Sequence, residues 1–282
     1  MFGEIIRKER LERNLTISEV CYDLSLYHSV FDKITEATYY RWETEKSPMP
    51  LRQVVILDYF GLVEVLSKMS FKRSKKSLDL YEKLATRLFN SDSSSSLFNN
   101  SVIREYNFEK NALSFLERHE IKYHLCSINV DIDFSEIFKK TDDDKHIEVY
   151  SLEMDSIVVG YAIYMYIPIF DIMKNFSSQD FNSFNHNVDF QKNKFGVFLL
   201  GGGVPNEFFY KFIIKKLYGN HIKYPKHRLC YSFVESNFKN WTSLIKSIGF
   251  SDVVSFPNRK KIHCIKPFEV LSNPILNEIS RL

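Results

Sequence analysis

Apolar side chains recur every three or four residues through most of the first 89 positions of the chain. This spacing places them on one face of an α-helix and predicts an all-helical N-terminal part. Residues 90–101, NSDSSSSLFNNS, break the pattern with small polar side chains and predict a linker. The apolar positions that carry the helical spacing are Phe2, Ile5, Ile6, Leu11, Ile17, Val20, Cys21, Val54, Val55, Leu57 and Phe60.

Beyond the linker the pattern changes to the shorter apolar runs that are typical of β-strands. Two such runs within residues 147–169 flank the polar turn Met154-Asp155-Ser156 and predict a hairpin. The apolar run 195–200 stops at three glycines, and a helical pattern led by Pro205 follows it. The last expected elements are a strand at 228–234, a helix at 238–248 closed by Gly249, and strands at 253–256 and 261–265.

Length, charge and cysteine spacing narrow the classes of function. A chain of 282 residues predicts about two domains. The net charge of +3 is too small for a protein that coats long stretches of nucleic acid, so any contact with a polyanion is expected to be local. The four cysteines are far apart, and we expect no disulfide and no metal site. Neither an export signal nor a membrane span is recognisable, which predicts a cytoplasmic protein without membrane contact.

Two phrases in the first 61 residues carry a specific resemblance. Thr16, followed three positions later by Glu19, has the spacing of a capping box that begins a helix. Residues 35–50, TEATYYRWETEKSPMP, combine a short amphipathic helix, a Trp-Glu pair, a basic residue and a proline-led turn. Together these phrases resemble the helix-turn-helix domain of the Cro and phage-repressor type, the XRE family. Residues 25–34 depart from that family by inserting a longer connection before the third helix, so the angle between the two helices stays open.

The resemblance implies that the third helix reads DNA. On this helix Tyr39, Trp42 and Glu43 share one side, which leaves another side for the major groove. Arg41 is suited to guanine, and Glu36 is suited to the amino group of cytosine. The implied base-reading residues are Thr35, Glu36, Ala37, Tyr40 and Arg41, with Thr16 and Lys46 close to phosphates.

Residues 62–89 continue the helical pattern after the DNA-binding unit. A small domain cannot bury such an apolar stripe alone, so we expect the stripe to meet a second copy of the chain. A homodimer would also offer two reading helices to successive turns of double-stranded DNA.

The second part of the chain resembles the GNAT acetyltransferase superfamily in the order of its expected elements and in two phrases. The phrases are VYSLEMDSIVVGYAIYMY at 149–166 and CYSFVESNFKNWTSLIKSIGF at 230–250. An opening strand near 102–106 and helices at 108–119 and 134–140 fit the same order. The resemblance implies that the turn after the fourth strand presents backbone amides to acetyl-CoA or another acyl-CoA. The implied ligand-binding residues are Gly201, Gly202, Gly203, Val204, Asn206 and Asn237.

The same segment departs from the superfamily where catalysis is concerned. Ile245 stands where many members have a tyrosine that acts as general acid, and Leu200 precedes the glycines where Gln or Arg is usual. Pro205 also removes one backbone N–H from the implied turn. We therefore assign no catalytic residue.

Taken together, the sequence predicts a helix-turn-helix domain at 1–66, connecting helices and a linker at 67–100, and a GNAT-like domain at 101–282. The fold class is all-α followed by α+β with a mixed, mostly antiparallel sheet. The expected function is a dimeric, sequence-specific transcriptional regulator whose second domain senses a small molecule, binds a protein partner or stabilises the dimer. The first alternative is an N-acetyltransferase with a helix-turn-helix targeting domain. The second is an antitoxin-like or phage-repressor protein that holds a tight protein partner.

Overall fold

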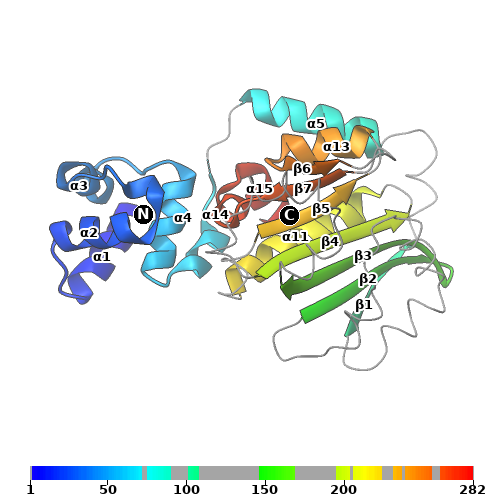
Figure 1. Cartoon of the computed structure of the whole chain (residues 1–282), viewed down its shortest axis with the longest axis horizontal. Helices are drawn as coiled ribbons and strands as arrows, with labels where there is room; N and C mark the ends of the chain where they lie inside the picture. Colours follow the sequence, from blue (N-terminus) through cyan, green and yellow to red (C-terminus); the bar gives the residue numbers. More distant parts are fainter. Residues whose placement is uncertain are drawn as a thin grey trace.

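The computed structural model of the chain describes residues 2–71, 75–89, 101–107, 146–168, 195–203, 206–223, 231–236, 239–255 and 261–281 (Figure 1). The expected linker at 90–101 lies outside these ranges except for Ser101, and the helices expected at 108–119 and 134–140 also lie outside them. The described residues form a helical lobe at the N-terminal end and a larger lobe in which helices cover a β-sheet (Figure 1).

Residues 2–71 contain helices and no strand, and we call this part the helical head. The expectation of an all-helical N-terminal part is confirmed. Its inward-facing Ile6, Val20, Leu24 and Leu57 are completely buried, as the three- and four-residue spacing predicts. The elements of the head are α1 (Phe2–Glu12), α2 (Ile17–Tyr27), the 3₁₀ helix η1 (Ser29–Phe31), α3 (Glu36–Thr44), α4 (Pro50–Tyr59) and the 3₁₀ helix η2 (Val63–Lys68).

Seven strands of the described part form one sheet in the order β1-β2-β3-β4-β5-β7-β6. Strands β4 and β5 are parallel to each other, and every other neighbouring pair is antiparallel. The expected mixed, mostly antiparallel sheet is confirmed. The strands are β1 (Val102–Asn107), β2 (His146–Met154), β3 (Ile157–Pro168), β4 (Phe195–Gly203), β5 (Tyr231–Ser236), β6 (Ser251–Ser255) and β7 (Lys261–Ile265).

The predicted hairpin is formed by β2 and β3, and its turn is one residue shorter than the predicted Met154-Asp155-Ser156. Met154 pairs with Ile157, and the two residues between them are Asp155 and Ser156. Both have positive φ angles, 50° and 66°, as a type I′ turn requires. This turn matches the right-handed twist of the flanking strands, so it sets their register.

One face of the sheet is covered by α11 (Glu207–Lys223). Tyr150 and Leu152 of β2 point to this face, because side chains two positions apart share one side of a strand. They pack with Ala162 and Tyr164 of β3 against Phe209, Ile213 and Leu217 of α11. The other described helices of this lobe are α13 (Lys239–Ser247), α14 (Pro267–Ser272) and α15 (Pro274–Arg281).

Residues 62–89 do not form the continuous helix with an uncovered stripe that the sequence predicted. They divide into η2 and α5 (Lys75–Phe89), and α5 packs along α13 in the larger lobe (Figure 1). Tyr81 and Phe89 of α5 are buried in the same apolar core as Leu244 and Ile248 of α13. The part of the stripe around Tyr81 and Phe89 is therefore covered within one chain, whereas Leu80 of the same helix is 50% exposed.

The head packs directly against the C-terminal end of the chain. Helix α4 lies beside α14, and the ring of His28 meets the edge of Phe268 with centroids 5.4 Å apart (Figure 1). At the other side of this junction the Arg281 guanidinium donates to the Met69 carbonyl oxygen at 3.2 Å. A single apolar core runs from Phe2 in the head to Ile279 in α15. The two lobes are thus joined by buried side chains in addition to the connecting chain.

Candidate functional site

Helix α2 begins at the capping box that the sequence predicted. The backbone N–H of Glu19 donates to Thr16 Oγ1 at 3.2 Å. In return the Glu19 carboxylate accepts from the Thr16 backbone N–H at 2.7 Å and from its hydroxyl at 2.8 Å. These hydrogen bonds lower the pKa of Glu19, because they stabilise its charged form. The hydroxyl of Thr16 is therefore occupied at the helix start.

The longer connection between α2 and α3 folds into one turn of 3₁₀ helix. His28 Nδ1 accepts from the Val30 backbone N–H at 3.1 Å and starts this turn. The turn places Phe31 in the core, where only 1% of it is exposed. Its ring meets Trp42 edge-on with centroids 6.1 Å apart. The inserted residues therefore anchor the buried side of α3 to the core. This contact fixes the angle between α2 and α3, which the sequence left open.

Helix α3 separates a buried side from an exposed side as predicted. Tyr39, Trp42 and Glu43 are buried, with exposed fractions of 0%, 8% and 6%. On the other side Tyr40 is 54% exposed. Its exposed neighbours on this side, which we call the outer face of α3, are Glu36, Ala37 and Arg41.

Thr35 caps α3 and is less available for a base than the resemblance implied. Its Oγ1 accepts from the Thr38 backbone N–H at 3.2 Å and lies 2.9 Å from the Thr38 hydroxyl. A side-chain oxygen at this position satisfies one of the unpaired amides of the first helical turn. Thr35 thus defines where α3 begins, which in turn sets which side chains lie on the outer face.

A buried ion pair, which sequence reasoning did not find, holds α3 against α1. Arg10 donates through Nε to one carboxylate oxygen of Glu43 at 2.7 Å and through Nη2 to the other at 2.9 Å. Its third donor reaches the Leu15 carbonyl oxygen at 3.0 Å. The carboxylate raises the pKa of Arg10. No local pattern marks this pair, since 33 residues separate its members.

Two cations lie beyond the end of α3, the exposed Lys46 and the partly exposed Arg52. Lys46 is exposed directly after the helix. Arg52, in the first turn of α4, lies over the Trp42 ring with its guanidinium carbon 5.7 Å from the centroid. The α4 start is fixed by Gln53, whose side chain donates to the Pro48 carbonyl oxygen at 2.6 Å. A proline-led fourth helix was predicted, whereas the stacked Arg52 was not.

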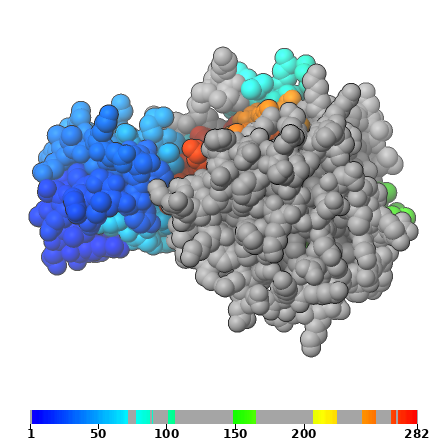
Figure 2. All heavy atoms as spheres, viewed as in Figure 1, coloured from blue at the N-terminus to red at the C-terminus, as the bar shows by residue number. Residues whose placement is uncertain are grey.

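The outer face of α3 is exposed at one end of the molecule. Figure 1 shows α3 at the end of the head that is farthest from the sheet. In the space-filling view the head forms a distinct lobe at one end of the molecule (Figure 2). The exposed Tyr40 and Arg41 are therefore free of cover by the larger lobe.

The second candidate site lies where β4 gives way to α11. Here the sequence prediction needs a correction, because Gly201, Gly202 and Gly203 continue β4 instead of forming a turn. They pair with Ala162, Tyr161 and Gly160 of β3. Strand β5 follows β4 only as far as Leu199, which pairs with Val234. The pairing of the two parallel strands therefore ends just before the glycines.

The start of α11 is capped by its own side chains. Asn206 Oδ1 accepts from the Phe209 backbone N–H at 2.8 Å. Glu207 places a carboxylate in the first turn and pairs with Lys211 at 2.8 Å. A carboxylate here already interacts favourably with the positive end of the helix dipole. Asn206 thus acts as a helix cap, and Ile245 is a core residue with 3% of its surface exposed. Val204, Pro205 and Asn237 lie outside the described residues.

None of the models of known protein families matches the chain, and neither a curated protein nor a solved structure does. Among the described residues, no helix combines the length and the apolar character that crossing a membrane requires.

Proposed function

We propose that the chain binds double-stranded DNA through the outer face of α3 and regulates transcription. The observation that carries this proposal is the division of α3 into a buried side and an exposed one. Tyr39, Trp42 and Glu43 hold the helix, while Tyr40 and Arg41 stand exposed at the end of the molecule. A helix held in this way can enter a major groove, which is wide enough to admit it.

The side chains of the outer face suit base edges. Arg41 offers two parallel donors for the O6 and N7 acceptors of guanine, and Glu36 offers an acceptor for the amino group of cytosine. Lys46, exposed just beyond the helix, is suited to a phosphate on the flank of the groove. The hydroxyl of Thr16, which was expected close to a phosphate, donates to the Glu19 carboxylate. The proposed contribution of Thr16 to DNA binding is therefore to fix the start of α2. The proposal includes a homodimer, because one reading helix contacts only a few base pairs.

The larger lobe is proposed to have a GNAT-like fold. The order of its described elements along the chain supports this: a strand, a hairpin, a strand followed by a helix, a further strand and helix, and a final strand pair. The single parallel pair, β4 and β5, supports it as well. In the regulator this lobe would sense a ligand or a partner, and the buried junction between α4 and α14 gives it a direct contact with the head.

The DNA-binding proposal is tested by selecting double-stranded sequences from a random pool with the full chain. Affinity for the selected sequence is then measured by gel shift at fixed salt. We expect Arg41→Ala to weaken binding about 5- to 150-fold, the loss of one bidentate base contact. Arg87→Ala is the matched control, because Arg87 is an exposed arginine on α5 in the larger lobe. Failure to enrich any sequence, or equal affinities of the two variants, would contradict the proposal.

A second candidate function is binding of an acyl-CoA, with N-acetyl transfer as the associated activity. The end of the β4–β5 pairing just before the glycines favours it, whereas Asn206 and Glu207 already occupy the helix start. Titration calorimetry of the full chain with acetyl-CoA separates the two outcomes. Saturable binding that Gly202→Val abolishes supports the second candidate, and the absence of heat at millimolar acetyl-CoA removes it.

A further inference from the structure

Three neighbouring residues of the outer face of α3, which we call the outer triad, are Glu36, Ala37 and Tyr40. Tyr40 follows Glu36 by four positions and Ala37 by three, and residues at these spacings lie about 5–6 Å apart on the surface of a helix. All three are exposed, and Tyr40 has 54% of its surface accessible to solvent. The triad therefore presents a carboxylate beside an aromatic ring and a methyl group.

The carboxylate of Glu36 is available to a hydrogen-bond donor. In the part of the chain that the structure describes, neither Glu36 nor Tyr40 uses its side chain in a hydrogen bond or an ion pair. The Thr44 hydroxyl reaches Tyr40 at the backbone carbonyl oxygen, at 2.9 Å, and leaves the phenol ring uncovered. By contrast, the carboxylate of Glu43 on the same helix is buried against Arg10. Glu36 is thus a carboxylate of α3 that a ligand can reach.

The outer triad matches a pyrimidine base that has a hydrogen-bond donor next to a methyl group. In the major groove cytosine presents its N4 amino group as a donor, whereas thymine presents the O4 acceptor and a C5 methyl group. An ionised carboxylate only accepts hydrogen bonds, so Glu36 attracts the amino group of cytosine and repels O4 of thymine. Ala37 and Tyr40 favour a methyl group, because apolar surface removes it from water. Cytosine methylated at C5 combines both features.

We propose that the outer triad reads 5-methylcytosine, so that methylation of the DNA site strengthens binding. Glu36 distinguishes this base from thymine through the N4 amino group, and Ala37 and Tyr40 distinguish it from unmodified cytosine through the methyl group. This inference rests on the proposed function and names the base that the outer face of α3 recognises. Binding of the chain is then regulated by the methylation state of its DNA site.

The test uses the double-stranded sequence that the full chain selects from a random pool. Each cytosine of this duplex is replaced in turn by 5-methylcytosine and by thymine, and each affinity is measured by gel shift at fixed salt. At the cytosine that the outer triad contacts, methylation should strengthen binding about three- to fivefold, the effect of burying one methyl group. Thymine at the same position should bind at least about tenfold more weakly than 5-methylcytosine.

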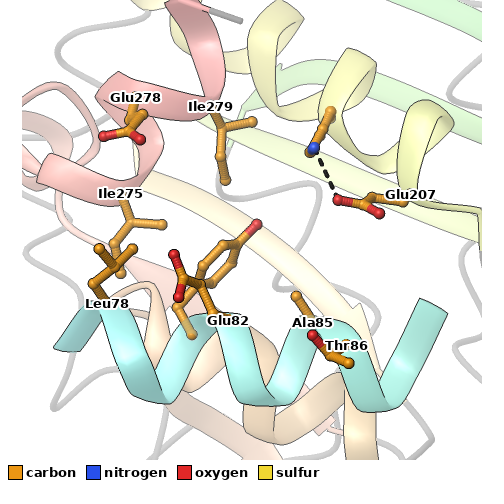
Figure 3. A pocket seen from close by; sticks show the side chains of 10 residues that line it. Leu78, Glu82, Ala85, Thr86, Glu207, Ile275, Glu278 and Ile279 are labelled. Atoms are coloured by element: carbon orange, nitrogen blue, oxygen red, sulfur yellow. Dashed lines mark ion pairs between the residues drawn. The ribbon is translucent and has the colours of Figure 1, made fainter. Parts of the chain in front are cut away.

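Two variants separate the members of the triad. Glu36→Gln introduces an amide that donates as well as accepts, so this variant should bind the thymine and 5-methylcytosine duplexes within about twofold of each other. Tyr40→Ser should lose most of the preference for the methyl group and keep the discrimination against thymine. Glu82→Gln is the matched control, because Glu82 is an exposed carboxylate on α5 in the larger lobe (Figure 3), and it should change neither ratio. Unfolding midpoints verify that each variant is folded.

The inference is overturned if methylation strengthens binding at no cytosine of the selected duplex, or if Glu36→Gln discriminates against thymine as strongly as the wild type does. It is also overturned if Glu82→Gln changes the ratios as much as the triad variants do. In these cases the chain still binds DNA, so the proposed function stands. If no sequence is selected from the pool, the proposed function fails and this inference fails with it.

Discussion

Replacing Arg10 by methionine would leave the buried carboxylate of Glu43 without its guanidinium partner. The Glu43 side chain is 1% exposed and the Arg10 side chain 12%, so water cannot substitute for the lost bonds. Two hydrogen bonds, at 2.7 and 2.9 Å, disappear together. Breaking a buried pair from one side costs about 3–5 kcal/mol, a large part of the roughly 5–15 kcal/mol that stabilises a folded domain. The loss should appear in the free energy of unfolding measured with urea.

The chain offers a matched control for this variant in the same helix. Lys8 pairs with Glu12 at 3.6 Å, but their side chains are 73% and 57% exposed. Lys8→Met should therefore change the free energy of unfolding by no more than about 0.5 kcal/mol. Replacing Arg10 by Met and Glu43 by Leu together should restore most of the stability, since no charge remains buried. Equal effects of Arg10→Met and Lys8→Met would refute the reasoning.

Two further predictions concern close packing and pH. A Cβ atom on Gly3 would lie 2.5 Å from the Trp42 carbonyl oxygen, so Gly3→Ala should destabilise the head by about 1–3 kcal/mol in thermal unfolding. Gly219→Ala in α11 meets no atom within 4 Å and should instead stabilise the chain by about 0.5–1 kcal/mol; destabilisation by both changes would contradict this contrast. Folding lowers the pKa of Glu19 from its usual 4.5. The stabilising effect of the Glu19 carboxylate is therefore present above pH 4.5 and is lost as the pH falls through the folded-state pKa. The stability advantage of the wild type over Glu19→Gln should accordingly be larger in urea unfolding at pH 7 than at pH 3, and an equal difference at both pH values would count against the capping contact.

Local patterns in the sequence were sufficient to predict helix α3 and the β2–β3 hairpin. Helical spacing identified Tyr39 and Trp42 as buried residues, because one turn of helix fixes which positions share a side. The polar turn at Asp155 and Ser156 likewise fixed the hairpin. The helices α14 and α15 were not predicted, although Pro267 and Pro274 stand at the first helical position, where proline marks a start.

The errors arose where distant contacts override local preference. Three consecutive glycines predicted a turn, but the β3 partner supplies the hydrogen bonds that keep Gly201–Gly203 in a strand. The stripe at 62–89 predicted an external partner, and the sequence could not reveal that α13, 150 residues later, covers part of it. The pair between Arg10 and Glu43 was hidden for the same reason.

The central claim, that the outer face of α3 lies against nucleobases, is tested most directly by site-specific photo-crosslinking. Benzoylphenylalanine is introduced in place of Tyr40, which is 54% exposed on α3, and in place of Leu80, which is 50% exposed on α5. Each protein is irradiated on the DNA sequence selected by the full chain. The account predicts cross-links to bases from position 40 and none from position 80. Binding to that DNA without a base cross-link from position 40, or with equal yields from both positions, would contradict it.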